Sequence, residues 1–142
     1  MSDPGFGSPR PGEVWLDTRD RSPAMWAHLG ALIAAAFLGP LGFVVPLVIM
    51  QGAGKRSPFV REHAREALNF QLTLLIAAAV GFAVAVVLVL LTLGLALLVF
   101  IVPAVLIAVA VSIVALIWQI QACMAANSGR PYRYPVSLRL VH

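Results

Sequence analysis

Charge is scarce in this sequence, and the scarcity is the strongest constraint on what the chain can be. Charged residues make up 11% of the 142 residues and hydrophobic residues make up 61%, whereas a soluble domain carries about 25% charged residues. A soluble protein of this size leaves much of its surface in water and could not hide so much apolar side chain. The composition therefore predicts a small, single-domain integral membrane protein.

Cysteines and catalytic motifs are also few. Cys123 is the only cysteine, so no disulfide can form within the chain. The sequence contains no zinc signature, no phosphate-binding glycine loop and no paired Glu-x-x-His motifs. Lipid chemistry by His63 with Glu62 or Glu66 is the one enzymatic alternative. We expect instead a protein that is not an enzyme and has no cofactor and no bound metal.

The ten basic residues all lie outside the long apolar stretches. They are Arg10, Arg19, Arg21, Lys55, Arg56, Arg61, Arg65, Arg130, Arg133 and Arg139. Basic residues that flank apolar segments favour the cytoplasmic face and anionic lipid heads. We therefore predict a membrane protein whose 55–65 loop and C-terminal tail are cytoplasmic, with Lys55, Arg56, Arg61, Arg65, Arg130 and Arg133 contacting lipid heads or that face. No basic face with interleaved aromatic residues suggests nucleic acid as a partner.

The longest run without charge extends from Ala67 to Gly129. It is about three times the ~20 residues that one membrane span needs. It therefore holds two spans and a turn, and Thr92-Leu93-Gly94 is the best place for the turn because glycine gives the backbone freedom to reverse. The predicted spans are about Ala67 to Leu91 and about Leu95 to Ala122.

An earlier apolar run, from Ser22 to Gly54, is too long for one span and too short for two full ones. Gly39-Pro40 and Pro46 interrupt it. It forms either one kinked span or a hairpin of two short helices, about Met25–Leu38 and Leu41–Gln51. The hairpin keeps all ten basic residues on one face, so we favour it.

The resulting fold class is an all-α integral membrane protein, a small bundle in which four helices are favoured over three. The helical membrane domain covers residues 24–140. Residues 1–23 are rich in proline, glycine and charge, a composition typical of a disordered polar tail.

The segment from Ser57 to Gln71 carries the most specific pattern. Ser57 followed by Pro58 is a favourable helix start. Glu62, Glu66, Asn69 and Thr73 then fall on one face of the helix, with His63 on the neighbouring face. Such a polar stripe is costly at the edge of an apolar span unless it has partners. It is either a docking face or the mouth of a polar path, or it forms hydrogen bonds that fix the helix bundle.

Two further polar positions lie at the ends of apolar stretches. His28 follows Trp26 near the start of the first run, which is typical of a pair at the membrane interface. Gln119 and Gln121 point to nearly opposite sides of a helix. We expect one of them to pack inward and the other to lie near the interface.

Several motifs resemble those of a known family. They are Met25-Trp26-Ala27-His28-Leu29, Ser57-Pro58-Phe59-Val60, His63-Ala64, Glu66-Ala67-Leu68-Asn69-Phe70-Gln71 and the segment 125–135. Together they resemble a bacterial membrane domain of unknown function related to the Tic-twenty subunit of the chloroplast protein import machinery. The resemblance implies a four-helix domain of the bacterial inner membrane with both ends on one side, and relatives implicated in moving proteins through a membrane.

The functional expectation is a non-enzymatic accessory or assembly subunit of a larger membrane complex. Its partners would be membrane lipids and other membrane proteins or further copies of itself. The alternative is an oligomeric channel or a protein-translocation element, in which the stripe from Glu62 to Thr73 lines the route. Four helices are too few to enclose a wide pore, so this alternative requires several copies.

Overall fold

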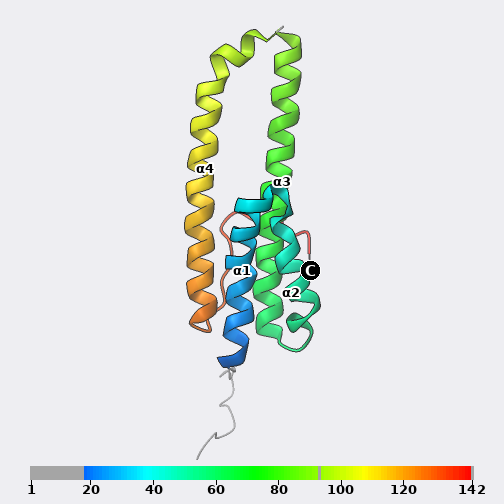
Figure 1. Ribbon diagram of the computed structural model, residues 1–142, viewed down its shortest axis with the longest axis vertical. Coiled ribbons are helices and arrows are strands. Elements are labelled where there is room, and N and C mark those ends of the chain that lie inside the picture. Colours follow the sequence, from blue (N-terminus) through cyan, green and yellow to red (C-terminus); the bar gives the residue numbers. More distant parts are fainter. Residues whose placement is uncertain (1–17, 93, 142) are drawn as a thin grey trace, which may run out of the picture.

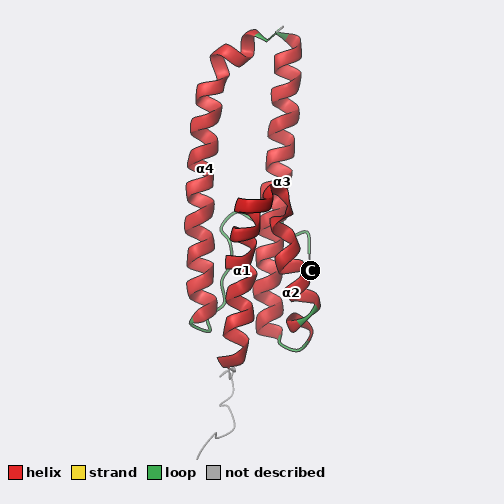
Figure 2. Cartoon of the chain, viewed as in Figure 1, coloured by secondary structure: helices red, strands yellow, loops and turns green. Residues whose placement is uncertain are grey.

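The computed structural model describes residues 18–92 and 94–141, and every regular element in this part is a helix (Figures 1 and 2). The elements are α1 (Thr18–Leu38), the 3-10 helix η1 (Gly39–Phe43), α2 (Val44–Gln51), the 3-10 helix η2 (Ala53–Lys55), α3 (Pro58–Leu91) and α4 (Leu95–Asn127). Three helical stretches, residues 18–51, 58–91 and 99–127, are long and apolar enough to cross a membrane. The chain is thus an all-helical membrane protein.

The two long helices α3 and α4 meet at the turn that the sequence predicts. α3 ends at Leu91 and α4 begins at Leu95, while Leu93 lies outside the described residues. Gly94 has a φ of 87°, a left-handed conformation that glycine adopts without a steric penalty. α3 begins at Pro58, as the Ser57-Pro58 pattern predicts, so the polar segment and the apolar span form one continuous helix of 34 residues.

The start of α1 corrects the predicted N-terminal boundary. Residues 1–17 of the expected disordered tail lie outside the described residues, but residues 18–23 form the first turns of α1. Asp20 stabilises this extension in two ways. Its carboxylate suits the positive end of the helix dipole, and it accepts a hydrogen bond of 2.6 Å from the Ser57 hydroxyl.

The first apolar run folds back on itself. Val45 lies against Gly30, and Gly42 lies against Ala35, so α1 and α2 run antiparallel. A Cβ atom at Gly42 would come within 2.8 Å of the Ala35 Cβ, which is why this crossing requires glycine. The two predicted limbs do not match in detail. The first is longer, because α1 begins at Thr18, and the second is shorter, because η1 extends the turn to Phe43.

The molecule divides along its length into two parts (Figure 1). The part we call the base consists of α1, η1, α2, η2, residues 58–71 of α3, residues 115–127 of α4 and the tail 128–141. In the base, α1 packs against both α3 and α4. The part we call the apolar hairpin consists of residues 72–91 of α3 and 95–114 of α4. All the buried residues of α3 lie in the base.

The Ser57 cap gives a first prediction. The Ser57 hydroxyl accepts a hydrogen bond from the Val60 N–H and donates one to Asp20, so it joins the starts of α3 and α1. Ser57→Ala should lower the free energy of unfolding by about 1–2 kcal/mol, the usual cost of a lost N-cap, measured by thermal unfolding in detergent. Ser128→Ala is the matched control, because that exposed hydroxyl bonds only to its own helix. Equal effects of the two changes would contradict this role.

Candidate functional site

Two histidines and a tyrosine from three separate segments meet inside the base. His28 comes from α1, His63 from α3 and Tyr134 from the tail. His28 Nε2 lies 3.0 Å from His63 Nδ1, and His28 Nδ1 lies 2.8 Å from the Tyr134 hydroxyl. His63 Nε2 lies 3.0 Å from the Arg130 carbonyl oxygen. Both imidazole rings are 0% exposed, so these hydrogen bonds satisfy rings that solvent does not reach.

The chemistry of the partners fixes the direction of each hydrogen bond in the series that joins Arg130, His63, His28 and Tyr134. A carbonyl oxygen can only accept, so His63 Nε2 carries a hydrogen and donates it to Arg130. In a neutral ring the other nitrogen then accepts, so His63 Nδ1 accepts from His28 Nε2–H. By the same argument His28 Nδ1 accepts from the Tyr134 hydroxyl. One tautomer of each neutral histidine thus fits the geometry.

Tyr134 is held firmly enough to act as the donor at the end of this chain. Its ring stacks on Phe70, with ring centroids 3.9 Å apart and planes 4° apart, and 3% of its surface is exposed. Burial raises the pKa of Tyr134 well above its ordinary value, and nearby Cys123, Tyr132 and Glu66 raise it further. Burial also raises the pKa of Tyr132. Both phenols therefore keep their hydrogens at neutral pH.

The polar stripe of α3 anchors the C-terminal tail. Asn69 makes three hydrogen bonds with the end of the tail: its Oδ1 accepts from the N–H groups of Leu140 (3.0 Å) and Val141 (2.7 Å), and its Nδ2 donates to the Val141 carbonyl (3.1 Å). The Thr73 hydroxyl accepts from the Leu138 N–H at 2.7 Å. The stripe therefore supplies partners for an irregular backbone segment, as a strand would in a sheet.

Glu66 is the buried carboxylate of the stripe, with 1% of its surface exposed. Its Oε2 accepts a hydrogen bond from the Tyr134 N–H at 3.4 Å, and its Oε1 lies 3.7 Å from Arg139 Nη1. A buried charge is costly unless it is paired. The tail supplies both the partner charge and a donor, so Glu66 also depends on the tail.

The structure thus brings together four of the five stripe residues predicted from the sequence. Glu66, Asn69 and Thr73 hold the tail, and His63 joins them through Arg130. Glu62 does not join them, because it pairs with Arg65 one turn along the helix surface. Asn69 and Thr73 bond to the tail and not to another helix.

Two other polar positions can be compared with expectation. His28 was expected to lie at the membrane interface with Trp26. Its side chain instead points from α1 into the base, toward His63. Gln119 packs inward and accepts a hydrogen bond of 3.1 Å from the Gln71 amide, while Gln121 is exposed. This confirms that one of the two glutamines packs inward, whereas a place for Gln121 near the membrane interface stays a prediction.

The basic residues proposed to meet lipid heads lie on the surface of the base. Lys55, Arg56, Arg61, Arg130 and Arg133 are exposed, whereas Arg65 is half-buried and paired with Glu62. Lys55 and Arg61 line a cleft of about 250 Å³ together with Met50, Gln51 and Gly54. Contact of these residues with lipid heads stays a prediction.

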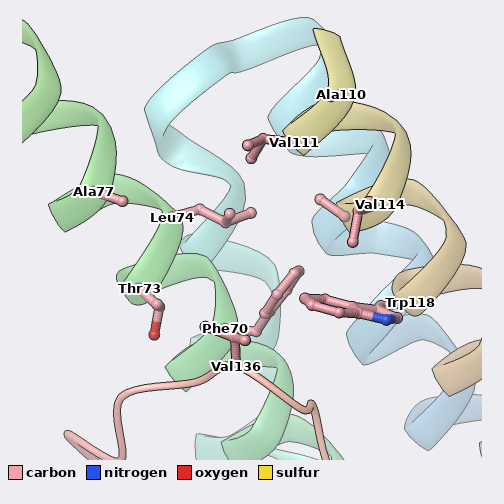
Figure 3. Close-up of a pocket in the computed structure, with 10 residues that line it drawn as sticks. Phe70, Thr73, Leu74, Ala77, Ala110, Val111, Val114, Trp118 and Val136 are labelled. Carbon is pink, nitrogen blue, oxygen red and sulfur yellow. The ribbon is translucent and has the colours of Figure 1, made fainter. Parts of the chain in front are cut away.

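An apolar cavity of about 370 Å³ lies between α3 and α4 where the base meets the apolar hairpin (Figure 3). Its lining is Phe70, Thr73, Leu74, Ala77, Ala110, Val111, Val114, Ala115, Trp118 and Val136. Phe70 and Trp118 face each other edge to face, with ring centroids 6.1 Å apart. The cavity suits an acyl chain or an apolar side chain, and its lining contains no carboxylate, imidazole or thiol.

The carboxylates of the described residues all have partners. Asp20 bonds to Ser57, Glu62 pairs with Arg65, and Glu66 bonds to the tail. Within residues 18–92 and 94–141, no three His, Cys, Asp or Glu side chains gather as a potential metal site. The acids Asp3, Glu13 and Asp17 lie outside the described residues.

Sequence reasoning missed the part played by Tyr134 and the end of the tail. Residues 132–140 alternate apolar and other side chains, which is typical of extended backbone, but this pattern does not predict that the tail returns along α3. The available signal was the unexplained polar stripe itself. The stripe needs polar partners, and the backbone of the C-terminal tail, 60 to 70 residues later, can supply them. This was the signal that the stripe and the tail meet.

Comparison with known proteins overturns the resemblance to the Tic-twenty-related family. No curated protein and no solved structure matches the chain. A family model does match, over residues 19–141, which includes every motif that carried the resemblance. The chain belongs to the magnetosome magnetite crystal formation protein family, MamF/MmsF.

Proposed function

We propose that this protein is a non-enzymatic accessory or assembly subunit of a membrane complex that acts in magnetite crystal formation. The observation that carries the proposal is the family match, which covers nearly the whole described chain. Three apolar helical stretches support a place in the membrane around the crystal. Iron is then the material that the complex handles, and this chain supplies structure and contacts.

The distribution of acidic groups favours an indirect role over direct contact with the mineral. A protein that binds iron ions at a mineral surface is expected to present free oxygen ligands, chiefly carboxylates. The three carboxylates in the described part of the chain are already engaged by Ser57, by Arg65 and by the tail. The exposed charges of the base are mostly basic, which suits anionic lipids and acidic partner surfaces.

The arrangement of the helices supports one orientation in the membrane. The α1–α2 hairpin returns the chain to the end of the molecule where α1 begins, and α4 returns it there again (Figure 1). Arg19, Lys55, Arg56 and Arg130 therefore lie at the same end as the tail. By the positive-inside rule this end is cytoplasmic. The ends of α3 and α4 at Leu91 and Leu95 then face the opposite side.

The oligomeric channel or protein-translocation element draws less support. It requires the stripe residues to offer free polar groups to a passing ion or chain. Asn69 and Thr73 instead use their polar atoms on the backbone of the tail. A channel would have to displace the tail first, so this function has no observation of its own in its favour.

The test is complementation in a magnetite-forming bacterium from which the family members have been deleted. Expression of this chain should restore crystal size and number, counted by electron microscopy, at protein levels confirmed by immunoblot. An expressed chain carrying the His63→Phe change serves as the matched control for a disturbed base. Crystals that stay as in the deletion strain, despite normal levels of the unaltered chain in the membrane, would contradict the proposal.

A further inference from the structure

The position of α1 relative to α3 shows how far the base can enter a membrane. Ala24 packs against Val60 in one cluster of buried residues. Ala27 packs against Ala64 and Ala67 in another. The first half of α1 therefore lies level with residues 60–67 of α3, and the two helices run in the same direction.

The far end of the α1–α2 hairpin is fixed in the same way. Gly42, in the turn between the two helices, lies beside the side chain of Gln71, where an added Cβ would be 3.1 Å from Oε1. The hairpin therefore ends at the level where the polar part of α3 ends. It does not continue along the apolar hairpin, as Figure 1 also shows.

Charged side chains and irregular backbone lie beside the part of α3 that packs against the α1–α2 hairpin. Arg61, Glu62, Arg65 and Glu66 all lie on the stretch of α3 that faces α1 and α2. The tail, which is not helical, is bonded to α3 as far as Thr73 and carries the exposed Arg133 and Arg139. Charged side chains are costly in hydrocarbon, and lipid-exposed irregular backbone does not occur there. The hydrocarbon of the membrane therefore begins at about Thr73 and extends along the apolar hairpin.

The length that remains fits a single crossing of each long helix. Residues 72–91 of α3 and 95–114 of α4 are each about 20 residues long, and a rise of 1.5 Å per residue gives roughly 30 Å, the thickness of the hydrocarbon core. Both segments are uncharged, and their large side chains are mostly exposed, as expected for contact with lipid.

We propose that only α3 and α4 cross the membrane, and that α1 and α2 form a hairpin on the cytoplasmic side whose apolar tip inserts into the adjacent leaflet. The tip residues Phe37, Leu38 and Leu41 are 84%, 60% and 48% exposed and lie where the base meets the apolar hairpin. Their surface is continuous with the lipid-facing surface of α3 and α4, so the partner is the acyl region of the bilayer. This inference rests on contacts and charges alone and is independent of the role in crystal formation.

The depth of spin labels tests this arrangement. Single cysteines at Val48, Phe37 and Phe82, all highly exposed, are introduced with Cys123→Ala and labelled in vesicles of phosphatidylcholine and phosphatidylglycerol. We expect Val48, on α2, to be reached by a water-soluble nickel chelate more than by oxygen. Phe37 should lie shallow in the leaflet, and Phe82 should lie deepest.

The opposite order would overturn the proposal. If the hairpin crosses the membrane, the Val48 label loses nickel accessibility and the Phe37 label lies as deep as the Phe82 label or deeper. Labelling of Val48→Cys by an impermeant maleimide, applied to the unlabelled single-cysteine protein from the cytoplasmic side, is an independent second measurement. Modification supports the surface hairpin, and protection contradicts it.

Discussion

Replacing His63 with phenylalanine is expected to cause a large loss of stability. Phenylalanine fills most of the space of the ring but removes both ring nitrogens. The Arg130 carbonyl then loses its donor and the buried His28 Nε2–H loses its acceptor. A buried polar group left without a partner costs about 1–3 kcal/mol, so the free energy of unfolding should fall by about 2–4 kcal/mol. Thermal unfolding in mild detergent measures the change.

A double-mutant cycle separates this hydrogen bond from packing. The variants are His28→Phe, His63→Phe and the two together. If the rings are bonded to each other, the double variant should cost at least about 1 kcal/mol less than the sum of the single changes, because removing both partners leaves neither unpaired. Strictly additive losses, or a His63→Phe protein as stable as the original, would contradict a hydrogen bond between His28 and His63.

Replacing Asn69 with leucine is expected to release the end of the C-terminal tail. The change keeps a similar volume but removes the three hydrogen bonds to Leu140 and Val141. At a net value near 1 kcal/mol for each bond, local opening of the tail should become easier by about 2–3 kcal/mol, or roughly 30-fold to 160-fold. Hydrogen–deuterium exchange of the backbone amides of residues 138–141 measures this directly.

Thr73→Val is the graded control for the tail. It removes the bond from the Leu138 N–H and the bond that the Thr73 hydroxyl donates to the Asn69 carbonyl within α3. Only the first involves the tail, so the rise in exchange should be near that of a single hydrogen bond and centred on residue 138. The Asn69 variant should also keep its helices, since Asn69 bonds to the tail and not to another helix. Unchanged exchange at residues 140 and 141 in Asn69→Leu would show that something else holds the tail.

The long helices were predictable because their signals are local. An uncharged run of this length must contain two spans. In the predicted turn Thr92-Leu93-Gly94, Gly94 is the residue that adopts a positive φ without strain. Ser57 with Pro58 marked the start of α3 for the same reason, since a cap acts within one helical turn. The polar segment and the span then follow each other in one helix, because no helix-breaking residue lies between them.

The first apolar run was predictable only in outline. Gly39 and Pro40 indicated an interruption, and the chain does reverse there. The lengths of the two limbs depend on tertiary contacts that no local pattern reveals. Asp20 extends α1 toward the N-terminus by bonding to Ser57, and Gly42 allows the return of the chain against Ala35. Ser57 is distant from Asp20 in the sequence, and a glycine at position 42 is needed only because the chain packs closely against Ala35.

The candidate site was found from one side only. The stripe on α3 was predicted from the cost of placing Glu66 and Asn69 near an apolar span. The tail was not predicted as its partner, because the alternating pattern of residues 132–140 indicates extended backbone without indicating the element that it contacts. His28 was expected at an interface because it follows Trp26, yet the twist of α1 directs the two side chains to different sides. The motifs that suggested the Tic-twenty-related family are the same residues that build this polar interior.

Purification from native membranes in mild detergent, with the associated proteins identified and quantified by mass spectrometry, tests the central claim most directly. The account predicts that the chain migrates in a complex with other magnetosome membrane proteins at fixed stoichiometry. It also predicts that this complex weakens when His63→Phe disturbs the base. A chain that migrates alone as a monomer, in a preparation where other membrane complexes of the same cells stay intact, would contradict a role as an accessory or assembly subunit.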